Sequence, residues 1–291
     1  MFLPSVGASG GILLGWHRER LSLTDVNLGQ CMLSTKVTTD SQLDYVWWLT
    51  IVYGPPQIES EKMAFLAELL QFRSLATCPW LICGDFNMIY RAQDKNNDRL
   101  DRTVMRRFRN FINQAQLKEI NMVDRRFTWS KQRGQPTLEL LDRVFASSEW
   151  LSEFPNHVLR PLSSDSSDHC PLLLQLNAFG ESKGRFRFEP FWVRLPGFCD
   201  MVANAWASSP AQSDPFRTID AKLRNVAKAL MSWSASNIGS LRLQLTLAPE
   251  AIFCFDIEKE RRTLEPWEFE LRRKLKMKVL GLASLPRTIV P

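Results

Sequence analysis

Two apolar stretches constrain the fold more than any other feature of the chain. The first, LDYVWWLTIVY at residues 43–53, is apolar at both alternating sets of positions and ends at Gly54 and two prolines. The second, at residues 80–83, ends abruptly in the sequence GDFN, residues 84–87. Strands that are apolar on both faces lie at the centre of a sheet with layers on both sides. These two stretches therefore favour a layered α/β fold with a mixed sheet.

Helical periods alternate irregularly with these strands. After Ser60, one apolar stripe recurs with helical spacing, at Met63, Leu66, Ala67 and Leu70. Thr103 can cap a second helix. Its predicted buried stripe is Phe108, Phe111, Ile112 and Ala115. Short strands are predicted around residues 127–130, 140–146 and 170–176.

The character of the chain changes after Asn177. Residues 178–190, AFGESKGRFRFEP, form a polar connector, and we place a domain boundary near 178–185. Beyond it, a helix is predicted whose apolar residues are Ile219, Leu223, Val226, Leu230 and Trp233. A later charged helix is interrupted at Pro266. The sequence thus predicts two domains, at residues 1–178 and 179–291.

Composition narrows the partners and the compartment. The net charge of +6 and pI of about 9.1 suit a polyanionic partner. Four arginines of the second helix, Arg102, Arg106, Arg107 and Arg109, are candidate nucleic-acid contacts, although taken alone they fit a solvated helix face better. The N-terminus has no basic leader and no apolar run long enough for a signal or a membrane span. None of the six cysteines has C-x-x-C spacing, which argues against a zinc knuckle. Several lie inside apolar runs, where a free thiol behaves as a small hydrophobic side chain, and this favours a reducing, intracellular compartment.

Polar side chains gather at the predicted strand ends. They are Tyr53, Asp85, Asn87, Asp142, Asp168 and His169. Each alone has an ordinary explanation: a turn for GDFN, an ion pair with Arg143 for Asp142, a structural role for the histidine. Together, at one edge of a sheet, they predict a site that hydrolyses a phosphate ester. Their oxygen atoms suit Mg²⁺ as a ligand set.

The chemistry assigns each residue a role. Asp85 can orient or deprotonate an attacking water, and Asn87 can donate to a developing oxyanion. Asp142 can hold one imidazole nitrogen of His169 and raise its pKa, so that the ring donates to a phosphate oxygen. Tyr53 can donate a phenolic hydrogen bond to the same phosphate.

These motifs resemble a known superfamily. Tyr53, GDFN, LDRVF at residues 141–145 and SDHCP at 167–171 are similar to the endonuclease/exonuclease/phosphatase superfamily, which includes deoxyribonuclease I. GASGG near the start, FTWS at 127–130 and RFRFEPFW at 185–192 resemble the endonuclease region of plant non-LTR (LINE-type) retrotransposons. The resemblance is strong over roughly residues 5–178. It implies a four-layer αββα sandwich with a helical extension that leads towards reverse transcriptase, and Mg²⁺- or Mn²⁺-dependent nicking of DNA in the nucleus. It implies neither a small-molecule cofactor nor a membrane partner.

One departure from the family bears on activity. In the family, an earlier segment supplies an Asn and the Glu that is the main metal ligand, whereas this chain begins immediately before GASGG. We therefore expect a partial domain lacking its N-terminal strands, in which Asp168, with Asp85, is left to hold the metal. We therefore expect an endonuclease whose catalysis is impaired and which retains nucleic-acid binding. The alternatives are an active endonuclease and a phosphatase of the same superfamily. A purely structural protein would require the four motifs to coincide by chance.

Overall fold

The computed structural model describes residues 1–6, 9–39, 45–131, 136–164, 167–176, 192–193, 196–208, 214–237 and 239–289. It divides into two compact units, one comprising Met1–Phe179 and Glu260–Thr263, the other Gly180–Lys259 and Leu264–Pro291. The connector at residues 178–190 and the expected boundary within it lie outside the described residues. The assignment of the two units to an endonuclease-like domain and a linker-like extension stays a prediction.

A six-stranded mixed sheet forms the centre of the first unit. Its strands are, in spatial order, β3 (Leu21–Leu28), β4 (Met32–Thr39), β5 (Val46–Tyr53), β6 (Trp80–Asp85), β10 (Asp142–Ser147) and β7 (Leu117–Glu119). The two apolar stretches of the sequence are the adjacent strands β5 and β6, which pair in parallel, while β10 is antiparallel to β6. The predicted central position of both strands is therefore confirmed.

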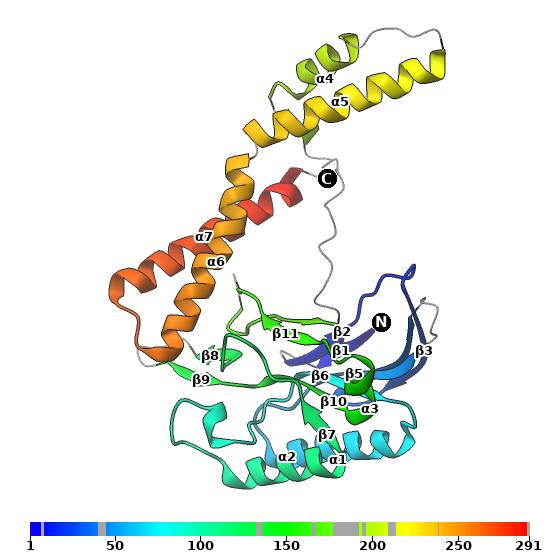
Figure 1. Ribbon diagram of the computed structural model, residues 1–291. Coiled ribbons are helices and arrows are strands. Elements are labelled where there is room, and N and C mark those ends of the chain that lie inside the picture. Colours follow the sequence, from blue (N-terminus) through cyan, green and yellow to red (C-terminus); the bar gives the residue numbers. More distant parts are fainter. Residues whose placement is uncertain are drawn as a thin grey trace. The chain divides into compact units, whose positions relative to one another are not determined.

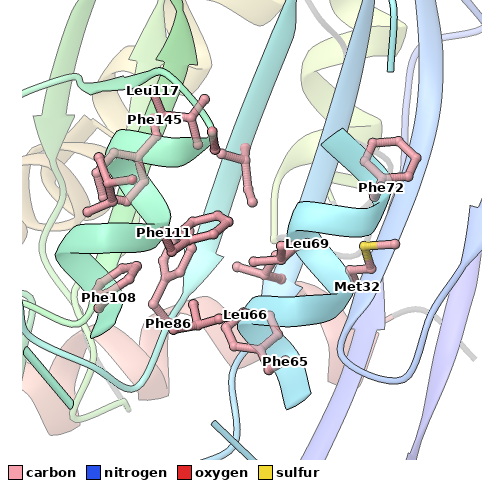
Figure 2. Packing of buried hydrophobic residues seen from close by; sticks show 14 of the residues in the cluster. Met32, Phe65, Leu66, Leu69, Phe72, Phe86, Phe108, Phe111, Leu117 and Phe145 are labelled. Atoms are coloured by element: carbon pink, nitrogen blue, oxygen red, sulfur yellow. The ribbon is translucent and has the colours of Figure 1, made fainter. Parts of the chain in front are cut away.

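Two helices, α1 (Glu59–Leu75) and α2 (Arg102–Gln114), cover one face of this sheet (Figure 1). Between them and the sheet lies an apolar core rich in phenylalanine, much of which Figure 2 shows at close range. The predicted stripe of α2 is buried as expected. The stripe predicted for α1 was partly wrong: Ala67 is exposed, and Phe65, Leu66, Leu69 and Phe72 are buried. The two phenylalanines offer more apolar area than alanine, so their positions set the buried face.

The start of α2 also differs from the expectation. Asp101, rather than Thr103, is the N-cap, and its carboxylate accepts hydrogen bonds from the backbone N–H groups of Thr103 and Val104. A carboxylate at this position satisfies orphan donors and also opposes the positive end of the helix dipole.

The other face of the sheet packs against short strands and one short helix. β11 (Val158–Pro161) pairs with β12 (Leu172–Gln175), and α3 (Ser148–Glu153) follows directly after β10. Their apolar side chains share a second core with the sheet, centred on Trp47, Val144 and Trp150. Three further elements are a hairpin of β1 (Phe2–Val6) and β2 (Ser9–Leu13), the pair β8 (Trp129–Lys131) and β9 (Thr137–Glu139), and the turn η1 (Ala92–Asp94). The layered α/β architecture predicted from the sequence is confirmed.

Strand direction brings the polar strand ends together. Tyr53 and Asp85 are in register at the carboxyl ends of β5 and β6, and Asp142 begins β10 directly opposite Asp85. Each helix returns antiparallel to β6, so the N-termini of α1 and α2 lie at this same end of the sheet.

The second unit is helical and consists of α4 (Phe198–Ala207), α5 (Pro215–Asn237), α6 (Gly239–Arg261) and α7 (Pro266–Ile289). The predicted break at Pro266 is confirmed, because α7 begins there. Leu230 of α5 is buried with Trp192 and Phe198, whereas Ile219 and Leu223 of the predicted stripe are exposed. Among the described residues, every helix is too short or too polar to span a lipid bilayer.

Candidate active site

Two glycines allow the strand ends of the site to approach each other. Gly84 has φ +138°, and a Cβ there would collide with the carbonyl oxygen of Val52 on the neighbouring strand. Gly54 lies against the carbonyl of Phe86, and its N–H donates to the carbonyl of Asp85 over 2.7 Å. A side chain at either position would force β5 and β6 apart. The glycines of YGPP and GDFN therefore fix where Asp85 lies.

Asn87 holds the carboxylate of Asp85 with two hydrogen bonds. Its backbone N–H donates to Oδ1 over 2.8 Å and its side-chain Nδ2 donates to Oδ2 over 2.9 Å. Nδ2 also donates to the carbonyl of Gly54 over 2.9 Å, so both amide hydrogens are used. The backbone of Asn87 is left-handed, with φ +49°, a conformation that asparagine tolerates better than most residues. The arrangement makes Asn87 a clamp for Asp85.

Asp142 and His169 form the hydrogen-bonded pair that the sequence predicts. His169 Nδ1 lies 2.9 Å from Asp142 Oδ2, and its other ring nitrogen, Nε2, lies 4.0 Å from Asp85 Oδ2. With a proton on Nδ1, the ring donates to Asp142 and turns Nε2 towards Asp85. The histidine is therefore placed between two carboxylates.

Thr128 positions Asp142, a role that the sequence did not reveal. Its hydroxyl oxygen accepts hydrogen bonds from the backbone N–H groups of Leu141 and Asp142, over 3.1 and 2.9 Å. The side chain is buried. The motif FTWS drew attention to this segment only as a resemblance; nothing local in it indicates a contact across 14 residues.

Trp129, the next residue, fixes the segment that carries His169. The backbones of Trp129 and His169 form an isolated antiparallel bridge. The indole Nε1 of Trp129 donates to Asp168 Oδ2 over 2.8 Å. Asp168 thus lies beside the histidine, with its carboxylate bound to the indole.

Burial and neighbouring charges shift the pKa values of Asp85 and His169. Burial, reinforced by the negative charge of Asp142, raises the pKa of Asp85 to about 6, although the hydrogen bonds from Asn87 and the nearby His169 oppose this. Burial alone would lower the pKa of His169. The hydrogen bond and charge of Asp142, aided by Asp85 and Asp168, outweigh it and raise that pKa. The shift brings the carboxyl group of Asp85 towards the pH range in which general acids and bases work.

Lys62 is a further charged residue at this end of the sheet. Its ammonium donates to the backbone carbonyl of Asn87 over 3.0 Å from the first turns of α1. Desolvation lowers its pKa, against the attraction of Asp101, Glu139 and Asp85. The sequence offered no signal for it, because a lysine near a helix N-terminus is usually an ordinary surface residue.

A cavity of about 390 Å³ opens beside Asp142 and His169 and is otherwise lined mostly by apolar side chains of β10, β11 and β12. Tyr53, in register with Asp85, lines a different hollow of about 220 Å³ with Pro55, Pro56 and Glu61. The structure therefore brings Asp85, Asn87, Asp142 and His169 together, with Tyr53 on the adjacent strand end.

The four arginines of α2 differ in their surroundings. Arg102 and Arg106 are exposed. Arg107 pairs with Glu59 at 3.3 Å, and Arg109 donates to the carbonyl of Tyr90 over 2.7 Å. Arg109 has a structural contact that ties α2 to the loop after GDFN, whereas Arg102 and Arg106 extend from the surface.

The residues present fit a divalent metal ion. Among the described residues, one group of potential ligands has its atoms within 4.8 Å of one another, and it consists of Asp85, Asp142 and His169. Burial, and after it the nearby charge of Asp142, disfavour the ionised form of Asp85, and a bound cation would stabilise that form. Asp168, expected to be the metal ligand, is not in this group.

Comparisons with known proteins agree with the motifs. Residues 47–173 match the family model described as "Endonuclease-reverse transcriptase". The resemblance to the endonuclease/exonuclease/phosphatase superfamily is thereby confirmed for this segment. No curated protein matches the chain.

Three solved structures are similar to part of this chain at low sequence identity. The endonuclease domain of TRAS1, a telomere-specific non-LTR retrotransposon, is 18% identical; the match covers 52% of this chain and 68% of that one, with a TM-score of 0.41. D. rerio TDP2, complexed with a single-strand DNA product, is 15% identical over 53% and 68% of the chains, with a TM-score of 0.38. A Bacteroides thetaiotaomicron mannosyl-6-phosphatase is 10% identical over 55% and 68%, with a TM-score of 0.34.

Proposed function

We propose that this chain is a divalent-metal-dependent phosphodiester hydrolase that nicks DNA, and the match of residues 47–173 to the family model described as "Endonuclease-reverse transcriptase" supports the proposal. One observation carries the proposal: His169 lies between Asp142 and Asp85, bonded to the first at 2.9 Å and 4.0 Å from the second. Asp85 can serve as the base and His169 as the acid, and Asp142 orients the imidazole of His169.

Asp85 is the group that takes a proton from the attacking water. With a pKa of about 6 in the metal-free protein, it is mostly ionised at neutral pH, yet basic enough to accept a proton. Asn87 grips both of its oxygen atoms and so fixes the direction in which the carboxylate can act. We assign Asn87 this positioning role in place of the expected donation to the phosphate, because both of its amide hydrogens are engaged.

His169 is the group that stabilises charge on the phosphate. Asp142 accepts a hydrogen bond from Nδ1–H, which selects the ring orientation and favours imidazolium. Nε2–H can then donate to a phosphate oxygen as negative charge builds there. Tyr53, at the neighbouring strand end, is proposed to donate its phenolic hydrogen to the same phosphate.

Mg²⁺, or Mn²⁺, is the proposed metal, since carboxylate oxygens are its preferred protein ligands. Asp85 would hold it, with Asp168 as a second ligand beside the site. When bound, such an ion neutralises charge on the phosphate and lowers the pKa of bound water. In the described cluster Asp142 is already bonded to His169, which leaves few oxygen atoms for the metal. We therefore propose that the 291-residue chain cleaves DNA slowly.

DNA is the proposed substrate because the protein is basic and exposes Arg102 and Arg106 at the site's end of the sheet. The test is a plasmid-nicking assay with Mg²⁺, with Mn²⁺ and with EDTA, beside an assay with a phosphomonoester. Slow nicking that requires the metal supports the proposal. Phosphomonoester hydrolysis without nicking would establish the phosphatase alternative, and DNA binding without any hydrolysis would establish a non-catalytic relic.

A further inference from the structure

A second hollow, of about 170 Å³, adjoins the catalytic cluster through Asp142. It lies beside the loop that follows GDFN, and its lining includes four arginines, Arg91, Arg125, Arg126 and Arg143. None of them belongs to α2 or to the cluster described above.

The acidic groups that line this hollow are all engaged. Asp94 and Glu119 both bind the guanidinium of Arg143, whose side chain is fully buried. Glu119 also accepts the phenolic hydrogen of Tyr90, over 2.5 Å, and Asp142 is bonded to His169. These carboxylates therefore have compensating partners within the protein, and their repulsion of an incoming anion is reduced.

Two of the arginines, Arg91 and Arg126, are exposed at the hollow. Arg126 donates to the carbonyl of Gln93 over 3.4 Å, and Arg91 comes immediately before the same turn, η1. Each guanidinium lies over a ring, Arg91 over Tyr90 at 4.6 Å and Arg126 over Phe127 at 5.3 Å, which restricts its motion.

Both guanidinium groups keep donors for a ligand. Arg91 lies 3.5 Å from Glu119, and Arg126 has one long contact with Gln93, whereas a guanidinium has five N–H donors. Arg125 differs, since it forms an ion pair with Glu260 at 3.0 Å. A planar guanidinium can donate two parallel hydrogen bonds to the oxygen atoms of a phosphate group.

We propose that Arg91 and Arg126 bind a backbone phosphate of a nucleic-acid strand next to the phosphate that lies at Asp85, Asp142 and His169. The position of the cleaved phosphate rests on the proposed function. A second phosphate subsite distinguishes a polynucleotide from a small phosphomonoester, which has no neighbouring phosphate to fill it. The substrate class is therefore a strand with repeated phosphates.

The test is the salt dependence of binding, measured by fluorescence anisotropy of a labelled 20-base-pair duplex in EDTA, so that no cleavage is required. The variants are Arg91→Gln, Arg126→Gln and the double substitution. Arg217→Gln is the matched control, because it removes the same charge at an exposed position of α5. The pair Arg91→Lys and Arg126→Lys keeps the charge and loses the planar fork.

Each phosphate contact contributes about one unit to the slope of log affinity against log salt. We expect the double glutamine variant to lose about one unit of slope relative to Arg217→Gln, because the two arginines bind one phosphate, and about tenfold or more in affinity. The lysine pair should keep the slope and bind more weakly. A double variant with the slope of the control, or a parent chain with no salt-dependent binding, would overturn the proposal. If the parent chain does not nick DNA but the double glutamine variant shows the expected loss of slope, the result would count against the proposed function and leave the phosphate subsite in place.

Discussion

Thr128→Val should destabilise the first unit, because it replaces a buried hydroxyl with a methyl group of the same size. The hydroxyl accepts two backbone hydrogen bonds, from Leu141 inside the core and from the part-buried Asp142. An unsatisfied buried donor costs about 1–3 kcal/mol, and a part-buried donor that water can reach costs less. The expected loss is therefore about 2–4 kcal/mol, a large fraction of the roughly 5–15 kcal/mol that stabilises a typical domain.

The assay is native-state amide exchange at Leu141 and Asp142, together with urea unfolding. Thr128→Ser is the control, since it keeps the hydroxyl and loses one methyl group, at about 1 kcal/mol. The valine variant should lose protection at both amides and should also nick DNA more slowly, because Asp142 loses its support. Exchange rates unchanged at both amides, or a serine variant as unstable as the valine variant, would refute the reasoning.

Three further predictions follow from the site. Asp142→Asn should lower the pKa of His169 in an NMR titration, and an equal midpoint in the two proteins would exclude the pairing. In the parent chain the raised pKa of His169 stabilises the folded protein fully below pH 6.5, and this stabilisation is lost as pH rises through the raised pKa. The pKa of Asp85 is raised from 3.8 to about 6, so this residue should stabilise the folded, metal-free protein fully below pH 3.8, and the stabilisation should be lost as pH rises through about 6. A carboxyl titration with a midpoint near 4 would contradict this. Gly84→Ala should lower the free energy of unfolding in urea by at least about 2 kcal/mol, because φ is +138° and the new methyl group would collide with the backbone of Val52. A loss below about 0.5 kcal/mol, which is roughly the scatter of surface substitutions, would show that the strands can adjust.

Residues whose role follows from strand position could be predicted from the sequence. Asp85 ends β6 and Asp142 begins β10, and the parallel and antiparallel pairing of β5, β6 and β10 places these termini at one edge. Asn87 follows β6 closely, and His169 precedes β12 closely. The bond between Asp142 and His169 followed from this placement and from the complementary chemistry of the two groups. Periodicity likewise located the buried face of α2, where bulky residues recur without interruption.

Contacts between distant segments could not be predicted in the same way. Thr128 reaches Leu141 and Asp142 through a register between loops that no local pattern encodes. The hydrogen bonds of Asn87 to Gly54 and Asp85 use both amide hydrogens, which changed its assigned role from phosphate donor to clamp. The stripe of α1 was misplaced because helical spacing alone does not distinguish Ala67 from its larger neighbours Phe65 and Phe72.

The rate of plasmid nicking by the 291-residue chain and its variants tests the central claim most directly. The comparison is between the parent, Asp85→Ala, His169→Ala and the control Asp220→Asn, whose carboxylate is exposed on α5. The expected result is slow, metal-dependent nicking by the parent and by Asp220→Asn, with Asp85→Ala and His169→Ala each at least about 100-fold slower, as befits loss of a general base or acid. Nicking at the parental rate by Asp85→Ala or His169→Ala would contradict the account.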